Sequence, residues 1–161
     1  SGHTTRPTRG VPPCGKFLNV CVTGQQYIWR FTYAQNCGKN DFKSVFTYTT
    51  LYVPTDTTVT LDIYGQDVAH SWWIPKLGGK FDAIPGYTNH TWFKISSKFA
   101  GHSFTGQCAE LCGRGHANMV ANVVALTPQR FEAWLARQKA NIKAADTSAA
   151  AQRKQVQKTI P

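Results

Sequence analysis

Acidic residues are scarce in this sequence, and their scarcity limits the partners to expect. The 161 residues include 8 Asp or Glu against 18 Lys or Arg, for a formal net charge of +10 at pH 7. Residues 1–16 carry three basic side chains and no acid, residues 137–161 carry six and one, and residues 17–136 carry nine and seven. Because the central region is nearly balanced, we predict no nucleic-acid partner. A weaker alternative is that the basic ends tether the chain to a partner by electrostatic attraction.

The sequence also lacks a long apolar run. A membrane-spanning helix needs about 20 mostly apolar residues, and no stretch approaches that length, which predicts a chain that is soluble as it stands. There is no initiator methionine, and the opening Ser-Gly-His is typical of a cleaved tag or a processed start. A membrane anchor upstream of this sequence therefore stays open. The pattern C-x-x-C-H does not occur either, so no covalently attached haem is expected.

Helical periodicity is rare, and strand patterns dominate instead. The expected strands alternate apolar and polar residues or are rich in aromatic and β-branched residues. They cover residues 17–24, 26–33, 44–54, 57–65, 90–95, 102–105 and 120–126. Such a run of short strands predicts an all-β fold, namely an antiparallel Greek-key β-sandwich with a short C-terminal helix.

The helix is expected to begin just after the last strand. Thr127 suits the N-cap and Pro128 the first turn, and Phe131, Trp134 and Leu135 fall on one face. The pattern ends near residue 142, and the rest, rich in Ala, Gln and Lys, is predicted to be frayed or disordered.

This pattern divides the chain into three parts. We expect a tag scar and Pro- and Gly-rich linker at 1–16, a β-domain at 17–136, and a basic low-complexity tail at 137–161.

The stretch GQCAELCGRGHANM, residues 106–119, contains two cysteines, a histidine and the only methionine of the chain. The spacing of Cys108, Cys112, His116 and Met119 would suit one face of a helix. Glycine in a helix interior, however, costs roughly 1 kcal/mol relative to alanine, and three glycines in this stretch favour a loop. Thiolates and an imidazole bind soft or borderline metals, and a thioether, which zinc rarely accepts, favours copper.

A mononuclear blue-copper site uses one cysteine, two histidines and a weak methionine ligand, so this loop has one cysteine too many. Two thiolates four residues apart can bridge a pair of copper ions, each capped by one histidine and one weak ligand. The second histidine must then come from elsewhere. His70 is the best candidate because it directly follows an expected strand, whereas His90 and His102 lie in strand-like contexts typical of surface or core histidines.

These residues give the chain a resemblance to the soluble copper domain of subunit II of cytochrome c oxidase. That domain has a cupredoxin fold and a binuclear copper centre, CuA. The resemblance rests on C-x-E-x-C-G-x-x-H-x-x-M at 108–119 and D-V-x-H-S-W at 67–72, with further similarity in GQQYIWRFTY, HTWFK and FEAWL. It covers roughly residues 17–136.

The resemblance implies a ligand set for two copper ions. Cys108 and Cys112 would bridge the ions, and His70 and His116 would be the terminal ligands. Met119 would be one weak ligand.

The resemblance implies two further roles for Glu110. Its backbone carbonyl would be the other weak copper ligand. Its side chain would face subunit I, where it would help to bind magnesium only in the full complex.

The resemblance also implies the function and its setting. The domain would accept electrons from cytochrome c and pass them to the haem of subunit I, without catalysis of its own in the proton-translocating oxidase. The full-length protein would be membrane-anchored, with this domain on the periplasmic or otherwise extracytoplasmic face, or in the mitochondrial intermembrane space.

Two features depart from the family. Tyr27 follows Gln26 where the family usually has tryptophan, so Tyr27 is the expected residue at which the electron enters. Cys14, Cys21 and Cys37 are additional, and an oxidising compartment favours one disulfide among them, with three pairings open.

Three alternatives use similar ligands. The CuA domain of nitrous oxide reductase would follow a propeller domain and is less similar around CAELCG. A thiol or copper metallochaperone would need a thioredoxin-like βαβ pattern, which consecutive strands do not supply. A structural zinc site of two cysteines and two histidines would leave Met119 without a role.

Overall fold

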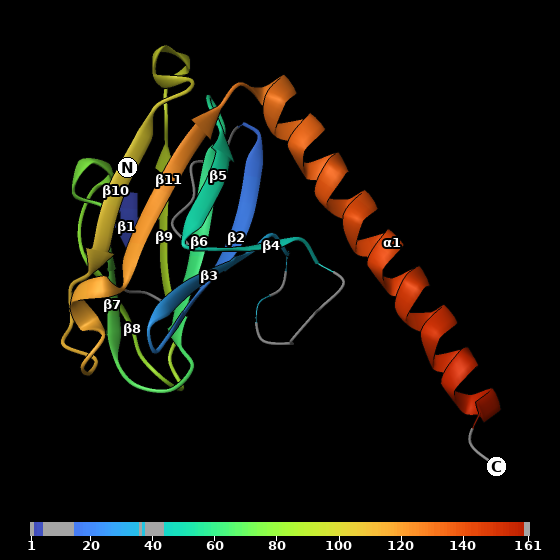
Figure 1. Cartoon of the computed structure of the whole chain (residues 1–161). Helices are drawn as coiled ribbons and strands as arrows, with labels where there is room; N and C mark the ends of the chain where they lie inside the picture. The colour runs from blue at the N-terminus through green and yellow to red at the C-terminus, as the bar shows by residue number, and fades with distance from the viewer. Residues whose placement is uncertain (1, 5–14, 36, 38–43, 160–161) are drawn as a thin grey trace.

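The computed structural model describes residues 2–4, 15–35, 37 and 44–159. Within these residues the strands form two sheets that pack face to face (Figure 1). The six-stranded sheet has the order β1-β9-β6-β2-β3-β4. Its strands are β1 (Gly2–Thr4), β2 (Phe17–Gln25), β3 (Ile28–Thr32), β4 (Phe46–Tyr48), β6 (Thr58–Gly65) and β9 (Asn89–Lys94).

The second sheet has five strands among the described residues, in the order β5-β11-β10-β7-β8. They are β5 (Thr50–Pro54), β7 (His70–Trp73), β8 (Phe81–Ala83), β10 (Ser103–Cys108) and β11 (Val120–Leu126). Short 3-10 turns lie at η1 (Pro75–Leu77), η2 (Ser97–Phe99) and η3 (His116–Asn118). The predicted two-layer β-sandwich is confirmed.

Alternation along the strands builds the core between the sheets. On β6, Val59, Leu61 and Ile63 are fully buried, because successive side chains of a strand point to opposite faces. On β10 the same period turns Phe104 and Cys108 inward, and both are buried. Strand geometry alone therefore directs the Cys108 thiol into the sandwich.

The prediction of a purely antiparallel sandwich is wrong at two pairs of strands. β2 pairs in parallel with β6, and β5 pairs in parallel with β11. Most residues of β2 and β6 are buried on both faces, which is the usual environment of parallel strands.

The expected strand over residues 44–54 is broken at Thr49, whose φ is 63°. β4 before this residue pairs with β3, whereas β5 after it pairs with β11. The chain therefore moves from one sheet to the other at a single residue with left-handed backbone, which the β-branched sequence conceals.

Three strands were not expected from the sequence. β7 and β8 pair with each other but are short and lie around the turn-rich segment IPKLGG. β1 pairs with β9 through Gly2↔Trp92 and Thr4↔His90, so the opening residues, set aside as a tag scar, add an edge strand. Most of the predicted linker, including Cys14, lies outside the described residues.

Helix α1 (Pro128–Thr159) follows β11. Its start is as predicted: the Arg130 backbone N–H donates to Oγ1 of Thr127 over 3.3 Å. Phe131 is buried, and the ring centroid of Trp134 lies 5.2 Å from that of Tyr33 and 4.9 Å from that of Tyr52. This aromatic cluster attaches the first turns of the helix to the sandwich.

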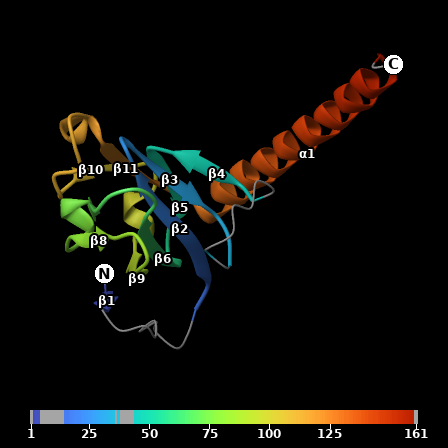
Figure 2. The same ribbon diagram turned by 90° about the horizontal axis from the view of Figure 1, so that it is seen from below.

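The predictions of a short helix and of a disordered tail after residue 142 are wrong. The helix has 32 residues and passes the predicted domain boundary at 136 without a break. Alanine recurs throughout residues 133–151, with no glycine or proline from 129 to 159, and alanine has the highest helix propensity. Figure 2 shows this part of α1 standing away from the sheets.

None of the described helices combines the length and the apolar character that a membrane crossing requires.

A disulfide joins Cys21 on β2 to Cys37, and their Cα atoms are 5.6 Å apart. This is one of the three pairings that the sequence leaves open. Cys108 and Cys112 are the free cysteines among the described residues.

Removing this disulfide is expected to lower the free energy of unfolding by about 3 kcal/mol, because a cross-link over 16 residues restricts the unfolded chain. The measurement is urea unfolding of the metal-free Cys21→Ala/Cys37→Ala variant against the wild type. Cys108→Ala/Cys112→Ala also removes two buried sulfurs but no cross-link, and is expected to cost clearly less. Equal losses of unfolding free energy in the two double variants would contradict a stabilising Cys21–Cys37 cross-link.

Candidate metal centre

Two cysteine thiols lie side by side at one end of the sandwich. Cys108 is the last residue of β10, and Cys112 lies in the loop that follows. Their Sγ atoms are 3.8 Å apart, and their side chains are buried, with 1% and 5% of the residue surface exposed. The two sulfurs are thus held close together without a bond between them.

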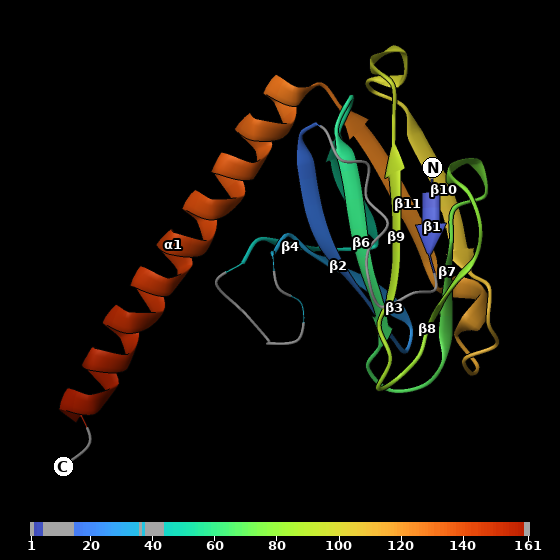
Figure 3. The ribbon, with the colours of Figure 1, turned by 180° about the vertical axis from the view of Figure 1, so that it is seen from behind.

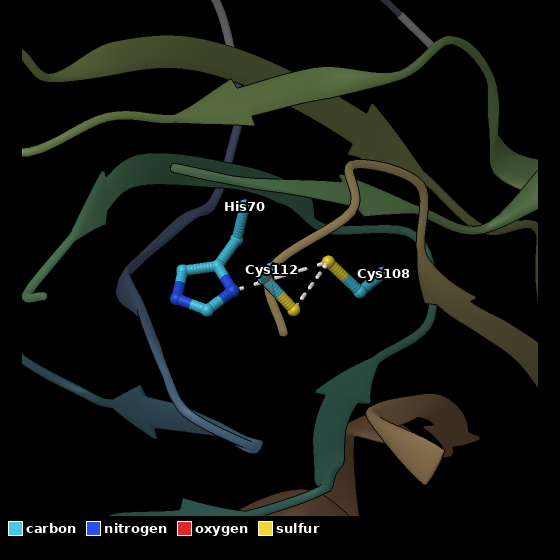
Figure 4. Close-up of side chains that lie close together, drawn as sticks. All are labelled: His70, Cys108 and Cys112. Carbon is cyan, nitrogen blue, oxygen red and sulfur yellow. Dashed lines mark hydrogen bonds between the residues drawn. The ribbon is translucent and has the colours of Figure 1, made fainter. Parts of the chain in front are cut away.

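His70 joins this pair from the neighbouring strand. It is the first residue of β7, not the end of the preceding strand, and Cys108 pairs with Trp72 of β7. The His70 ring is fully buried, with Nδ1 3.9 Å from Sγ of Cys108. Figure 4 shows the ring and both sulfurs converging, and the ligand atoms of these three residues all lie within 4.8 Å of one another.

His116 and Met119 approach the other cysteine. Nδ1 of His116 is 3.6 Å from Sγ of Cys112, and Sδ of the fully buried Met119 is 3.8 Å from the same sulfur. The Cys108 backbone N–H donates to the Met119 carbonyl over 2.9 Å. This hydrogen bond closes the base of the ligand loop.

The backbone of Glu110 also approaches the cluster. Its carbonyl oxygen is 3.2 Å from Sγ of Cys108, while the residue itself is exposed. The structure therefore brings together all six residues that the sequence analysis named as ligands.

Asp67, to which the sequence analysis gave no role, lies against His70. Its Oδ1 is 2.8 Å from Nε2 of His70, and its Oδ2 accepts the Gln26 backbone N–H over 2.7 Å. Partial burial would raise the pKa of this carboxyl, but hydrogen bonds from the Gln26 N–H, from His70 and from the Val68 N–H lower it. With Nε2–H donated to a charged carboxylate, Nδ1 of His70 is left free to bind a metal. The signal in the sequence was its place as the first residue of D-V-x-H-S-W, three residues before His70.

Burial and the adjacent Cys108 thiol raise the pKa of Cys112 to about 11. In the metal-free protein this thiol is therefore protonated at neutral pH. Metal binding to the pair would release protons.

Tyr27 lies directly against the ligand loop. A Cβ at Gly115 would come within 2.5 Å of Cγ of Tyr27, and one at Gly113 within 2.5 Å of its hydroxyl oxygen. The neighbouring Gln26 side chain donates to the Cys112 carbonyl over 2.7 Å. Tyr27 is 39% exposed, so it connects the outer surface to the loop that carries Cys112, a contact that depends on these glycines.

His90 and His102 lie in other environments. Nδ1 of His90 is 2.7 Å from Oδ1 of the buried Asp62. His102 is exposed, and its ring packs edge-on against Phe99. The preference for His70 over these two therefore agrees with the geometry.

The donor set suits copper. Two thiols, two imidazole nitrogens and a thioether converge, and the thioether is a ligand that zinc rarely accepts. Because Met119 takes part in the cluster, a zinc site of two cysteines and two histidines describes it less well. The burial of the two thiols and of the thioether, and the short distances between the donors, suit a soft metal.

A two-sheet β-sandwich with this cluster of soft donors at one end belongs to the class of cupredoxin-like domains. Its strands and late helix also exclude the thioredoxin-like pattern that a thiol metallochaperone would need.

Comparison with known proteins agrees with this class. The family described as "Cytochrome C oxidase subunit II, periplasmic domain" matches residues 18–126. A cytochrome c oxidase subunit 2 of Alkalihalophilus pseudofirmus is 38% identical over 137 residues, which are 85% of this chain and 37% of that protein. A heme-copper oxidase subunit 2 of Aeropyrum pernix is 36% identical over 74% of this chain and 49% of that protein. The chain belongs to the cytochrome c oxidase subunit II family and spans less than half the length of these relatives.

Solved structures give the same result. The periplasmic domain of subunit II of cytochrome oxidase from Bradyrhizobium japonicum has a TM-score of 0.67 and 28% identity, covering 78% of this chain and 95% of that chain. A mixed disulfide intermediate between a thioredoxin-like protein and subunit II of cytochrome c oxidase has a TM-score of 0.65 and 28% identity, covering 83% and 99%.

Proposed function

We propose that this domain is the electron-accepting part of a terminal oxidase and holds two copper ions in a CuA centre. It would accept electrons one at a time from a cytochrome c or a similar donor and pass them to the haem of subunit I. The domain would lie on the extracytoplasmic face of the membrane. The chain performs no bond-making step itself, because oxygen is reduced elsewhere in the complex.

One observation carries the proposal: each of two adjacent thiols has its own histidine. Nδ1 of His70 is 3.9 Å from Sγ of Cys108, and Nδ1 of His116 is 3.6 Å from Sγ of Cys112. A single zinc ion could also bind both pairs, but it would leave the Met119 sulfur without a role. Two copper ions bridged by both sulfurs would use both pairs and the thioether as well. The Met119 sulfur and the Glu110 carbonyl, beside Cys112 and Cys108 respectively, are the proposed weak ligands.

When bound, the two copper ions would supply a one-electron acceptor whose charge is shared over both metals and both sulfurs. The residues of the chain keep the ligands in place before and after electron transfer. Asp67 fixes the orientation of the His70 ring, and the Cys108–Met119 backbone hydrogen bond fixes the loop. Ligands carried on strands and supported by such partners change position little.

Tyr27 is the proposed residue at which the electron enters. Its exposed ring rests on the ligand loop, and Gln26 is hydrogen-bonded to the backbone of Cys112. Val68, Ile84 and Leu111 are also exposed and belong to segments that carry the ligands or pair with them. We call Tyr27, Val68, Ile84 and Leu111 the apolar rim and propose that the donor docks there.

The exposed Glu110 side chain would face subunit I in the assembled oxidase, where a magnesium ion would bind only in the full complex. Membership of the subunit II family supports this orientation. In that arrangement the end of the sandwich that carries the metal ligands points toward the membrane-embedded subunit.

Copper content and an electron-spin spectrum of the loaded protein test this proposal. We expect a purple protein with two copper ions per chain and hyperfine structure from an unpaired electron shared by both nuclei. One copper ion per chain, or splitting from a single nucleus, would reject the binuclear assignment.

A further inference from the structure

We propose that the part of α1 beyond Trp134, residues 136–157, binds an anionic lipid surface, so that the domain has a second attachment to the membrane beside the oxidase. The direction of this attachment rests on the proposed function, because it assumes that the metal end of the sandwich faces the membrane.

Residues 136–157 of α1 are mostly exposed to solvent. Beyond the aromatic cluster around Trp134, residues 136–157 are exposed apart from three half-buried positions, 138, 142 and 149. At a rise of about 1.5 Å per residue this stretch extends roughly 30 Å. Figures 1 and 3 show that α1 diverges from the sheets along its length.

Charge is strongly one-sided in this stretch. Residues 137–159 carry six basic side chains and a single acid, Asp146. Lys139, Lys143 and Lys154 are exposed, and at 100° per residue they fall within about 60° of the helix circumference. Asp146 lies at the edge of this basic face, which keeps a net positive charge.

Beside this basic face runs only a thin apolar stripe. Ile142, Ala149 and Val156 repeat at sevens along the helix, and Val156 is 57% exposed. So little apolar surface contributes weakly to membrane insertion or to a helix–helix dimer. The charge dominates, which favours an anionic surface over an apolar partner.

The direction of α1 delivers this charge to the metal end. β11 runs away from the ligand loop, and α1 then turns back, so that its C-terminal end reaches the level of the loops around residues 108–119 (Figure 1). If those loops face a membrane-embedded subunit, the basic face approaches the lipid headgroups around it. Clusters of four to eight Lys or Arg beside a membrane are typical of anionic lipid binding.

The test is flotation of the whole chain with vesicles of neutral phosphatidylcholine, with and without about one third phosphatidylglycerol. We expect binding only to the anionic vesicles, and release by 0.5 M salt, which shortens the Debye length to a few Å. A basic side chain near such a surface contributes roughly fivefold to partitioning. Lys139→Gln/Lys143→Gln/Lys154→Gln should therefore weaken binding on the order of a hundredfold.

The matched control is Lys76→Gln/Lys94→Gln/Lys98→Gln, which removes the same charge from exposed positions of the sandwich. It should leave binding within a few-fold of the wild type, with circular dichroism confirming that both variants keep their helix. Equal loss in both variants would overturn the proposal, and so would no binding to anionic vesicles. Binding to polyglutamate but not to vesicles would instead assign the basic face to an acidic protein. Metal-free protein is expected to bind equally, so failure here is distinguishable from failure of the copper assignment.

Discussion

Replacing Cys108 or Cys112 with serine is expected to abolish the shared-valence copper centre. Either change removes one of two buried sulfurs that are 3.8 Å apart, and a hydroxyl is a poor substitute for a thiolate toward copper. Copper content and the visible and electron-spin spectra measure the outcome. A serine variant that kept two copper ions with a shared electron would refute the bridging role.

Met119→Leu is the comparison for this experiment. Met119 is as deeply buried as the cysteines, and leucine has a similar volume. We expect the variant to retain two copper ions and to change its reduction potential, because a weak thioether ligand tunes a copper site more than it holds the metal. Complete loss of copper would show that Met119 is a principal ligand.

Tyr27→Ala is expected to slow reduction of the loaded domain by its donor about tenfold or more. An aromatic side chain at the centre of a contact commonly contributes 2 kcal/mol or more to binding, and Tyr27 rests on the ligand loop. Stopped-flow reduction by cytochromes c measures the rate. Tyr48→Ala is the matched control, since Tyr48 is similarly exposed, at 48%, but lies on β4. Equal slowing by both changes would remove Tyr27 from its proposed role.

The same reaction should depend weakly on salt. Residues 17–136 contain seven acids, and of these Asp62 and Asp67 already pair with His90 and His70. An apolar contact is insensitive to ionic strength, whereas surface charges more than about 10 Å apart are screened at 0.1 M. Basic and acidic donors should be compared across a salt series, with and without residues 137–161. If the rate of reduction by a basic donor fell steeply with rising salt, and removal of residues 137–161 did not change this, an acidic patch on the domain would be revealed.

Local patterns predicted the parts of the fold that depend on local rules. The alternation of β10 and the cap at Thr127 are read over a few residues, and both are present. The parallel pairing of β2 with β6 joins segments about forty residues apart, and no local pattern encodes it. The passage of the chain from one sheet to the other at Thr49 was hidden because the neighbouring residues favour strands. The helix continued past residue 142 because alanine propensity outweighed the lack of an apolar face.

In the candidate site, too, local patterns predicted one part and distant segments of the chain determine the other. The loop spacing and the resemblance named all the proposed ligands, but not how they are supported. The hydrogen bond from His70 to Asp67, and the contact of Tyr27 with Gly115, depend on three segments that meet only in the folded chain.

The hydrogen bond between the Cys108 N–H and the Met119 carbonyl makes the ligand loop a nearly self-contained module. Cys112, His116 and Met119 lie between two strands that are already paired, and Cys108 and His70 come from the strands of the scaffold. Changes in the length or sequence of this segment therefore need not disturb the ladder of β10 and β11. A β-sandwich of this kind can diversify its metal chemistry by exchanging one short piece of chain while the remainder of its architecture is inherited unchanged.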